Sequence, residues 1–197
     1  MPPERSEVQF GYPVVLGLHG VPVLVVGGGR IGARKASGLA AAGAVVRLVA
    51  VSVSDHVDRS SVAELREHPF TSADLDDVRL VVTATGDADV DAAVAAAARA
   101  RGIWVNAADQ PADCDFILPA IARRGRVSIA VSTDGASPAL ARELRDRIAA
   151  QLPDGLATLA DVLAAERAAV HAVGASTEDV DWTDRIRRAL GADRPNS

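Results

Sequence analysis

Short apolar runs alternate with longer amphipathic stretches over the first half of the chain. Runs at residues 14–18, 21–26 and 45–53 predict strands. The residues between the second and third runs, from Ile31 to Ala42, predict a helix that ends at Gly43. A strand, a helix and a second strand within about 30 residues form a βαβ unit, which places the two strands parallel in one sheet.

The same alternation continues toward the middle of the chain. A strand is predicted at residues 79–85, a helix at 88–101 that closes at Gly102, and a further strand at 103–106. Residues 63–70 allow another short strand, whose position the pattern leaves open. Elements in this order predict an α/β fold, a Rossmann-like doubly wound parallel sheet with helices on both faces.

The second half of the chain has a helical pattern. Ser137 followed by Pro138 predicts a helix start, with the hydroxyl as cap and proline in the first turn. An apolar stripe then follows at helical spacing, at Leu140, Leu144 and Ile148. Helical spacing resumes after residue 153, and a last helix is predicted at 181–190 before a polar tail that we expect to be disordered.

A glycine-rich turn joins the second apolar run to the first helix. Gly27, Gly29 and Gly32 fit the pattern G-x-G-x-x-G, directly after a strand and directly before a helix. Backbone N–H groups and the positive helix end can then approach a pyrophosphate, with Arg30 and Ile31 in the same turn. A tight turn with no ligand is the alternative, but the strand and helix on either side favour dinucleotide binding.

The acidic residue that often binds the ribose of NAD at the end of the second strand is absent. The residues that precede Asp55 are apolar apart from serines, so Ser52 or a backbone group is expected to substitute. Arg47 lies inside the predicted strand and gives no good case for a 2′-phosphate site. NAD is therefore favoured over NADP as the cofactor.

A second turn, TATGD, follows the strand predicted at residues 79–85. Thr83, Thr85 and Gly86 lie where a parallel sheet presents its carboxyl ends, beside the expected cofactor cleft. The alternative is a simple turn between strand and helix in which Asp87 or Asp89 caps the helix. The sequence is compatible with both a cofactor-binding turn and a simple capped turn.

Composition narrows the class of protein further. The chain has 197 residues, of which 49% are apolar, and no apolar run is long enough to span a bilayer. The first residues do not resemble a secretion signal, so we expect a cytoplasmic protein without a membrane partner. Cys114 is the one cysteine, which fits a reducing compartment, and the net charge of −5 argues against a nucleic-acid partner.

Longer motifs carry a specific resemblance. The segments YPVVLGLHGVPVLVVGGGRIGARK and VNAADQPADCDFILPAIARRGRVSIAVSTDGASPALARELRDRI contain GGGxxxxRK, VNxxDxPxxCDFxxPA and VSTxGxSPxLAR in that order. From about residue 12 to 152 the chain resembles the N-terminal region of siroheme synthases. This family comprises the precorrin-2 dehydrogenases, some of which are also sirohydrochlorin ferrochelatases.

The resemblance implies a three-part protein and a reaction. The parts would be an NAD-binding domain at residues 1–120, a small dimerisation region at 121–150 and a helical C-terminal domain at 151–197. The reaction would be NAD-dependent oxidation of precorrin-2 to sirohydrochlorin, for siroheme or a cobalamin precursor. Bifunctional relatives then insert ferrous iron, and the protein would act as a homodimer.

Asp109 is the catalytic candidate. It follows the strand predicted at 103–106, and oxidation of precorrin-2 releases a proton as well as a hydride, so a proton acceptor is needed there. It aligns with the aspartate that the family uses in catalysis and chelation. A turn aspartate before Gln110 and Pro111 is the alternative reading, and Asp115 is a second, weaker candidate.

The substrate of the family carries eight carboxylates, so an acidic chain must supply local positive charge. Arginine and lysine are the expected partners of these carboxylates. The alternative for each basic residue is that it is an exposed surface residue that binds no ligand. Thr133 stands where some relatives carry a phosphorylatable serine, and Asp134 replaces a glycine common there. The candidate substrate residues are Lys35, Arg124, Thr133, Ser137 and Arg142.

No metal site of the protein's own is predicted. The four histidines are far apart and form none of the usual zinc-ligand spacings. Iron would be bound by the nitrogens of the tetrapyrrole, with Asp109 as the base. A dinucleotide-sensing module without turnover is the alternative function, favoured by the missing ribose-binding acid and disfavoured by the longer motifs.

Overall fold

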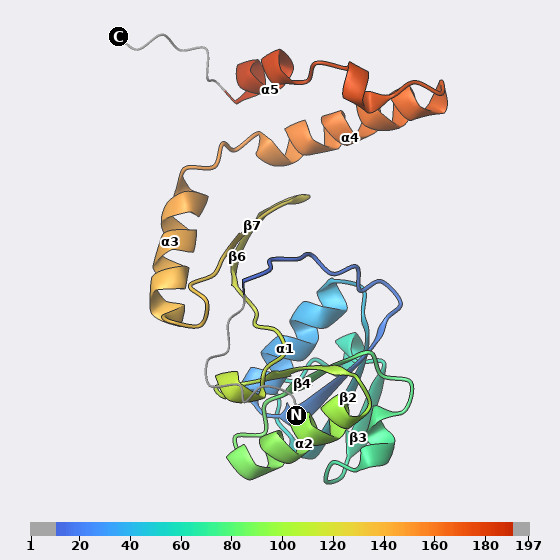
Figure 1. Cartoon of the computed structure of the whole chain (residues 1–197), viewed down its shortest axis with the longest axis vertical. Helices are drawn as coiled ribbons and strands as arrows, with labels where there is room; N and C mark the ends of the chain where they lie inside the picture. The colour runs from blue at the N-terminus through green and yellow to red at the C-terminus, as the bar shows by residue number, and fades with distance from the viewer. Residues whose placement is uncertain (1–10, 191–197) are drawn as a thin grey trace, which may run out of the picture. The chain divides into compact units, whose positions relative to one another are not determined.

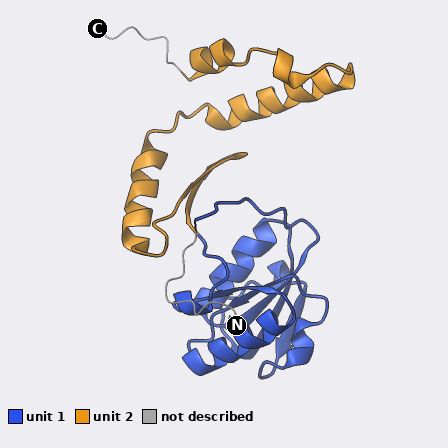
Figure 2. Ribbon diagram, in the orientation of Figure 1, with its two compact units in different colours: residues 1–118 blue, residues 119–197 orange. Residues whose placement is uncertain are grey.

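The computed structural model describes residues 11–190, which divide into two compact units. The first unit ends at Leu118 and the second begins at Pro119 (Figure 2). The disordered tail expected after residue 190 lies outside the described residues.

The first unit is built on a five-stranded parallel sheet in the order β3-β2-β1-β4-β5 (Figure 1). This is the order of a doubly wound fold: β2 and β3 follow on one side of β1, and β4 and β5 on the other, so the strand order reverses between β1 and β4. The strands are β1 Pro22–Gly28, β2 Val45–Val53, β3 Glu64–Glu67, β4 Leu80–Thr83 and β5 Trp104–Ala107.

Side chains of the central strands alternate between two apolar cores, because successive residues of a strand point to opposite faces. Val23 and Val25 of β1 pack on one face with the buried residues of helix α1, Arg30–Ala41. Leu24 and Val26 pack on the other face with helix α2, Ala88–Ala100. The sheet is therefore covered on both sides, which explains why its central strands are almost continuously apolar.

The predicted fold class and most of its elements are confirmed. The helix predicted at 31–42 is α1, the strand at 45–53 is β2, and the helix at 88–101 is α2. The short strand that residues 63–70 allowed is β3.

The strand predicted at residues 14–18 is wrong. Residues 11–18 form no strand, and Val15 is 95% exposed. An apolar run becomes a strand only where a neighbour supplies hydrogen bonds. Both edges of β1 are already taken, by β2 on one side and β4 on the other, so this run finds no place beside the central strand.

The edge of the sheet at β3 is held by ion pairs as well as by apolar packing on the core. Arg47 on β2 donates to the Glu64 carboxylate at 2.6 Å and to the Asp74 backbone carbonyl at 2.9 Å. Arg66 on β3 in turn donates to the buried Asp74 carboxylate at 2.8 Å. Burial alone would raise the pKa of Asp74, but hydrogen bonds from Thr71 and Arg66 lower it. Arg47 is thus committed to the fold.

Over residues 119–190 the second unit contains a hairpin, three α-helices and a single-turn helix at 177–179. The hairpin strands β6, Ala120–Arg124, and β7, Val127–Val131, are antiparallel and form a sheet of two. The helices are α3 Pro138–Ala150, α4 Leu156–Ala172 and α5 Thr183–Ala189. Ser137 caps α3 as predicted, since its hydroxyl accepts from the Leu140 amide at 3.2 Å. The further division predicted at residue 150 stays a prediction.

Among residues 11–190, no helix is long and apolar enough to cross a membrane. Within the first unit, short single-turn helices at 59–61 and 72–75 lie in the connections from β2 to β3 and from β3 to β4, and one at 111–113 follows β5.

The two-sided core yields a stability prediction. Val81 on β4 is fully buried, and Val51 on β2 is 75% exposed. We expect Val81→Ala to lower the free energy of unfolding by about 2–3 kcal/mol, because it leaves a cavity beneath α2. Val51→Ala is the matched control and should change it by less than about 0.5 kcal/mol. Urea unfolding measures both, and equal effects would contradict the packing described here.

Candidate functional site

The glycine turn after β1 is packed too tightly for side chains. A Cβ on Gly27, whose φ is +119°, would lie 2.3 Å from the carbonyl oxygen of Ala84 at the end of β4. A Cβ on Gly32 would lie 2.0 Å from the carbonyl oxygen of Gly27. These contacts bring the turn, α1 and the end of β4 together, as close packing of helix on strand requires.

Gly29 differs from its neighbours because it faces open space. A Cβ there would meet no atom within 4 Å. Gly29 is the N-cap of α1, yet no side chain caps the helix and its first turn holds no acidic residue. The exposed Arg30 and Ile31 begin that turn. The amide groups and positive end of α1 are therefore open to an anion, which fits the pyrophosphate of a dinucleotide.

The end of β2 contributes a serine that the sequence did not single out. Ser54 donates both its amide, at 2.9 Å, and its hydroxyl, at 2.8 Å, to the carbonyl of Gly28. The predicted Ser52 is exposed, and its carbonyl lies against Gly28. Ser54 thus fixes the glycine turn, while Ser52 is free to face a ligand. Its position directly after the strand predicted at residues 45–53 is the feature of the sequence that could have indicated a role for Ser54.

The turn after β4 caps the helix that follows it. Asp87 caps α2, accepting from the amides of Asp89 and Val90 at 3.0 and 3.2 Å, so the capping interpretation is confirmed. Thr85 and Gly86 are exposed at the carboxyl edge of the sheet. They remain cofactor candidates.

Thr83, which the sequence places beside the expected cofactor cleft, has its side chain in the core. Its hydroxyl is fully buried and donates to the carboxylate of Asp91 on α2. The same carboxylate accepts from the amide and hydroxyl of Thr85, at 3.1 and 2.8 Å. Thr83 points into the core because of its register on β4, so it supports the turn through Asp91 rather than presenting a group to a ligand.

Asp109 lies at the same edge, directly after β5. It is exposed and adopts φ +61°, a left-handed conformation that aspartate and asparagine tolerate better than most residues. The turn is held by the Ala108 amide, which donates to the Thr83 carbonyl at 2.9 Å. Asp115, the weaker candidate, instead accepts from the Val105 amide at 3.0 Å and from Arg99 at 3.2 Å, so it has a structural role.

Lys35 on α1 reaches the end of β5. Its Nζ donates to Oδ1 of the buried Asn106 at 3.1 Å. Burial lowers the pKa of Lys35, and the neighbouring Arg34 acts in the same direction, while Cys114 and Asp109 oppose them. Burial likewise raises the pKa of the Cys114 thiol. Of the predicted substrate residues, Lys35 is thus the one near Asp109 in the first unit.

The other predicted substrate residues belong to the second unit. Thr133 and Ser137 are brought together: the Thr133 hydroxyl donates to the Ser137 carbonyl at 3.1 Å and accepts from its amide at 3.0 Å. Arg124 and Arg142 are exposed. Asp134 adopts φ +54° in the same loop as Thr133.

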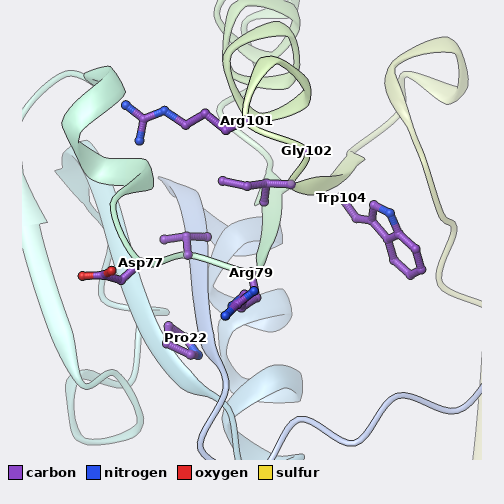
Figure 3. A pocket seen from close by; sticks show the side chains of 8 residues that line it. Pro22, Asp77, Arg79, Arg101, Gly102 and Trp104 are labelled. Atoms are coloured by element: carbon purple, nitrogen blue, oxygen red, sulfur yellow. The ribbon is translucent and has the colours of Figure 1, made fainter.

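A hollow of about 560 Å³ lies at the opposite edge of the sheet, where the strands begin (Figure 3). Pro22 and Arg79 line it at the starts of β1 and β4, and Trp104 at the start of β5. Ligands of parallel sheets bind at the carboxyl ends of the strands. We therefore place the functional site at the glycine turn and not in this hollow. Among residues 11–190, no cluster of three or more histidine, cysteine or acidic residues is arranged to hold a metal.

The strand order and the open glycine turn define a Rossmann-type dinucleotide-binding protein. The chain belongs to the family described as putative NAD(P)-binding, whose model matches residues 14–120. Residues 124–151 match a second model, described as sirohaem biosynthesis protein central. The resemblance seen in the longer motifs is thereby confirmed.

The names of similar proteins agree with this family assignment. A siroheme synthase of Methylococcus capsulatus is 46% identical over 90% of this chain, and one of Pseudomonas entomophila is 42% identical over 82%. The chain spans about a third of the length of each, 35% in both cases. A solved structure titled "SirC, precorrin-2 dehydrogenase" is 28% identical with a TM-score of 0.66, covering 94% of this chain and 90% of that one.

The glycine turn yields a paired prediction. Gly29→Ala adds a methyl group in open space and should fold normally, but it should weaken NAD binding about tenfold or more because the methyl group occupies the side open to an anion. Gly32→Ala should instead lower thermal stability, since the methyl group meets the Gly27 carbonyl. Calorimetric NAD titration and thermal unfolding measure the two effects. Unchanged NAD affinity in Gly29→Ala would place the cofactor elsewhere.

Proposed function

We propose that this chain is an NAD-dependent dehydrogenase that oxidises precorrin-2 to sirohydrochlorin, in the synthesis of siroheme or of a cobalamin precursor. The observation that carries the proposal is the common position of the open glycine turn and Asp109. Both lie at the carboxyl edge of one sheet, after β1 and β5, with β4 between them. The names of the relatives and of the solved structure support the choice of substrate.

The residues of the edge have separate tasks in this reaction. The amides of the glycine turn bind the pyrophosphate, and Thr85, Gly86 and Ser52 line the edge beside it. When bound, NAD supplies the hydride acceptor. Asp109 accepts the proton that precorrin-2 loses in the same oxidation, which its exposed carboxylate can pass to water. NAD is preferred to NADP because Arg47, the basic residue on β2, is committed to Glu64.

Ferrous iron insertion is proposed as a second activity of the same edge. Iron is then a substrate, and the tetrapyrrole nitrogens are its ligands. The protein must remove the pyrrole protons, for which Asp109 is again placed. We propose Arg124 and Arg142 as binding partners of the carboxylates of the macrocycle, with Thr133 and Ser137 as further polar contacts. We propose a cytoplasmic location for these reactions.

The test is an anaerobic assay with precorrin-2 and NAD, followed by ferrous iron. We expect NADH from the parent chain and a fall of at least about 100-fold in kcat for Asp109→Asn, typical of a lost general base. Asparagine keeps the left-handed backbone of residue 109, so the change removes the charge without distorting the turn. Iron insertion should fall in the same variant.

Asp113→Asn is the matched control, because it removes a nearby partly exposed carboxylate that pairs with Arg99. It should keep activity within about threefold. If the parent binds NAD but forms no NADH with precorrin-2, the dehydrogenase proposal fails and the sensing module, which binds a dinucleotide without turnover, takes its place.

We also propose that the chain acts as a homodimer through its second unit. Among residues 119–190, Ala141 is the only buried residue, and a sheet of two strands is marginal on its own. The apolar stripe of α3 is open to solvent: Leu140, Leu144 and Ile148 are 50%, 38% and 39% exposed. A second copy that covers this stripe would complete the missing core.

Charge on the stripe should break the dimer. We expect Leu144→Glu combined with Ile148→Glu to halve the mass measured by sedimentation equilibrium, because two carboxylates would be buried without partners. Val173→Glu makes the same change at a position that is 80% exposed after α4 and should leave the mass unchanged. A parent chain that sediments as a monomer at micromolar concentration would refute the dimer.

A further inference from the structure

Within the part of the chain that the structure describes, the partly buried ammonium of Lys35 has no ion pair with an acidic residue. Among the described residues its ammonium forms one hydrogen bond, to the neutral Oδ1 of Asn106 at 3.1 Å, and no ion pair. An ammonium group has three N–H donors, so two of them are left for a ligand. Burial costs a charged ammonium part of its hydration, and a negative partner offsets this cost. Among the described residues Lys35 forms no ion pair, which points to a ligand that brings the negative charge.

The side chain of Asn106 is held in the orientation that presents its oxygen to Lys35. Its Nδ2 donates to the backbone carbonyl of Phe116 at 3.0 Å and lies 3.7 Å from the sulfur of Cys114. The amide nitrogen is therefore turned away from Lys35, and the oxygen must face it. Asn106 is 5% exposed, so this arrangement is set before any ligand arrives.

The charges around Lys35 do not neutralise it. Burial, and then Arg34 on the same helix, lower its pKa, while the Cys114 thiol after the turn at 111–113 and Asp109 after β5 raise it. The net direction is downward, so these neighbours do not make up for the water that the ammonium has lost. An anion that binds to Lys35 would restore that stabilisation.

The position of Lys35 on the sheet identifies which anion it meets. The pyrophosphate site is the first turn of α1, beside β1, where Gly29 faces open space. Lys35 lies one turn further along α1 and reaches across to Asn106 on β5, the strand that leads into Asp109. Its ammonium thus lies at the end of β5, where Asp109 is proposed to act on the tetrapyrrole, and not at the pyrophosphate site.

We propose that Lys35 and Asn106 form a preset carboxylate anchor, in which Asn106 is the positioning residue and Lys35 binds one carboxylate of the tetrapyrrole beside Asp109. The inference rests on the proposed function and adds to it a residue, Asn106, that fixes where the substrate binds. The anchor acts on binding and not on the chemical step, so its loss changes KM for the macrocycle more than kcat.

Steady-state assays of the full chain with precorrin-2 and NAD test the anchor. We expect Lys35→Gln to raise KM for precorrin-2 about tenfold, with kcat and KM for NAD within about threefold of the parent. Lys35→Arg should restore most of the affinity because it keeps the charge. Arg34→Gln is the matched control, since it removes an exposed charge from the same helix, and it should leave KM within about threefold.

Asn106→Asp tests the positioning role directly. The substitution is nearly isosteric, but it places a carboxylate against Lys35, which pairs the ammonium internally and removes it from the substrate. We expect KM for precorrin-2 to rise at least as much as in Lys35→Gln, again without an effect on KM for NAD. Asn106→Asp combined with Lys35→Gln should then be no weaker than Asn106→Asp alone, because both changes remove the same anchor.

A binding assay separates failure of the anchor from failure of the proposed reaction. Quenching of the fluorescence of uroporphyrin, an octacarboxylate porphyrin, measures binding without turnover. If Lys35→Gln binds uroporphyrin about tenfold more weakly, with less dependence on sodium chloride, the anchor stands even where no NADH is formed. If Lys35→Gln and Asn106→Asp bind uroporphyrin and precorrin-2 like the parent, the anchor is refuted while the dehydrogenase activity is untouched.

Thermal unfolding gives a readout that a merely structural lysine would not produce. The pKa of Lys35 is lower in the folded chain than its ordinary value, so its charge opposes folding at neutral pH and this penalty fades only as the pH rises toward 10.5. Lys35→Gln should therefore leave the melting temperature unchanged or raise it at pH 7. A marked fall in melting temperature together with loss of binding would assign Lys35 to the fold and overturn the proposal.

Discussion

The pairing of β1 between β2 and β4, sealed by the glycine turn at its end, is the constraint on which the rest of this protein depends. Gly27 brings the end of β1 against the Ala84 carbonyl, and Gly32 lets α1 start against the same turn. Because no side chain intervenes, the amino end of α1 stands open at the edge of the sheet. The dinucleotide site is a consequence of this backbone packing.

Buried polar groups hold the rest of that edge in place. Asp91 gathers the hydroxyls of Thr83 and Thr85, Ser54 binds the Gly28 carbonyl, and Asn106 binds the Phe116 carbonyl. Each group is satisfied within the first unit, which makes the edge rigid before ligands bind. The exposed residues that remain, above all Asp109, can then be devoted to chemistry. Lys35 differs from both sets because, among residues 11–190, its ammonium forms no ion pair.

The two units differ in how they are stabilised. The first has apolar cores on both faces of its sheet, whereas the second buries almost nothing among its described residues. A hairpin and amphipathic helices without a core require a second surface, which is the physical basis for the dimer proposed here. The cofactor edge and the surface for self-association are thus separate features of the chain.

The sequence by itself determined the parallel sheet, its two covering helices and the glycine turn, because apolar period and glycine spacing are local properties of the chain. It also marked Asp109 and the cap at Ser137. Only the tertiary structure decided that residues 14–18 form no strand, since that depends on whether a neighbouring strand has a free edge. It likewise turned Thr83 into the core and joined Lys35 to Asn106, 71 positions away. Such contacts are set by register and packing between distant segments, which no local pattern encodes.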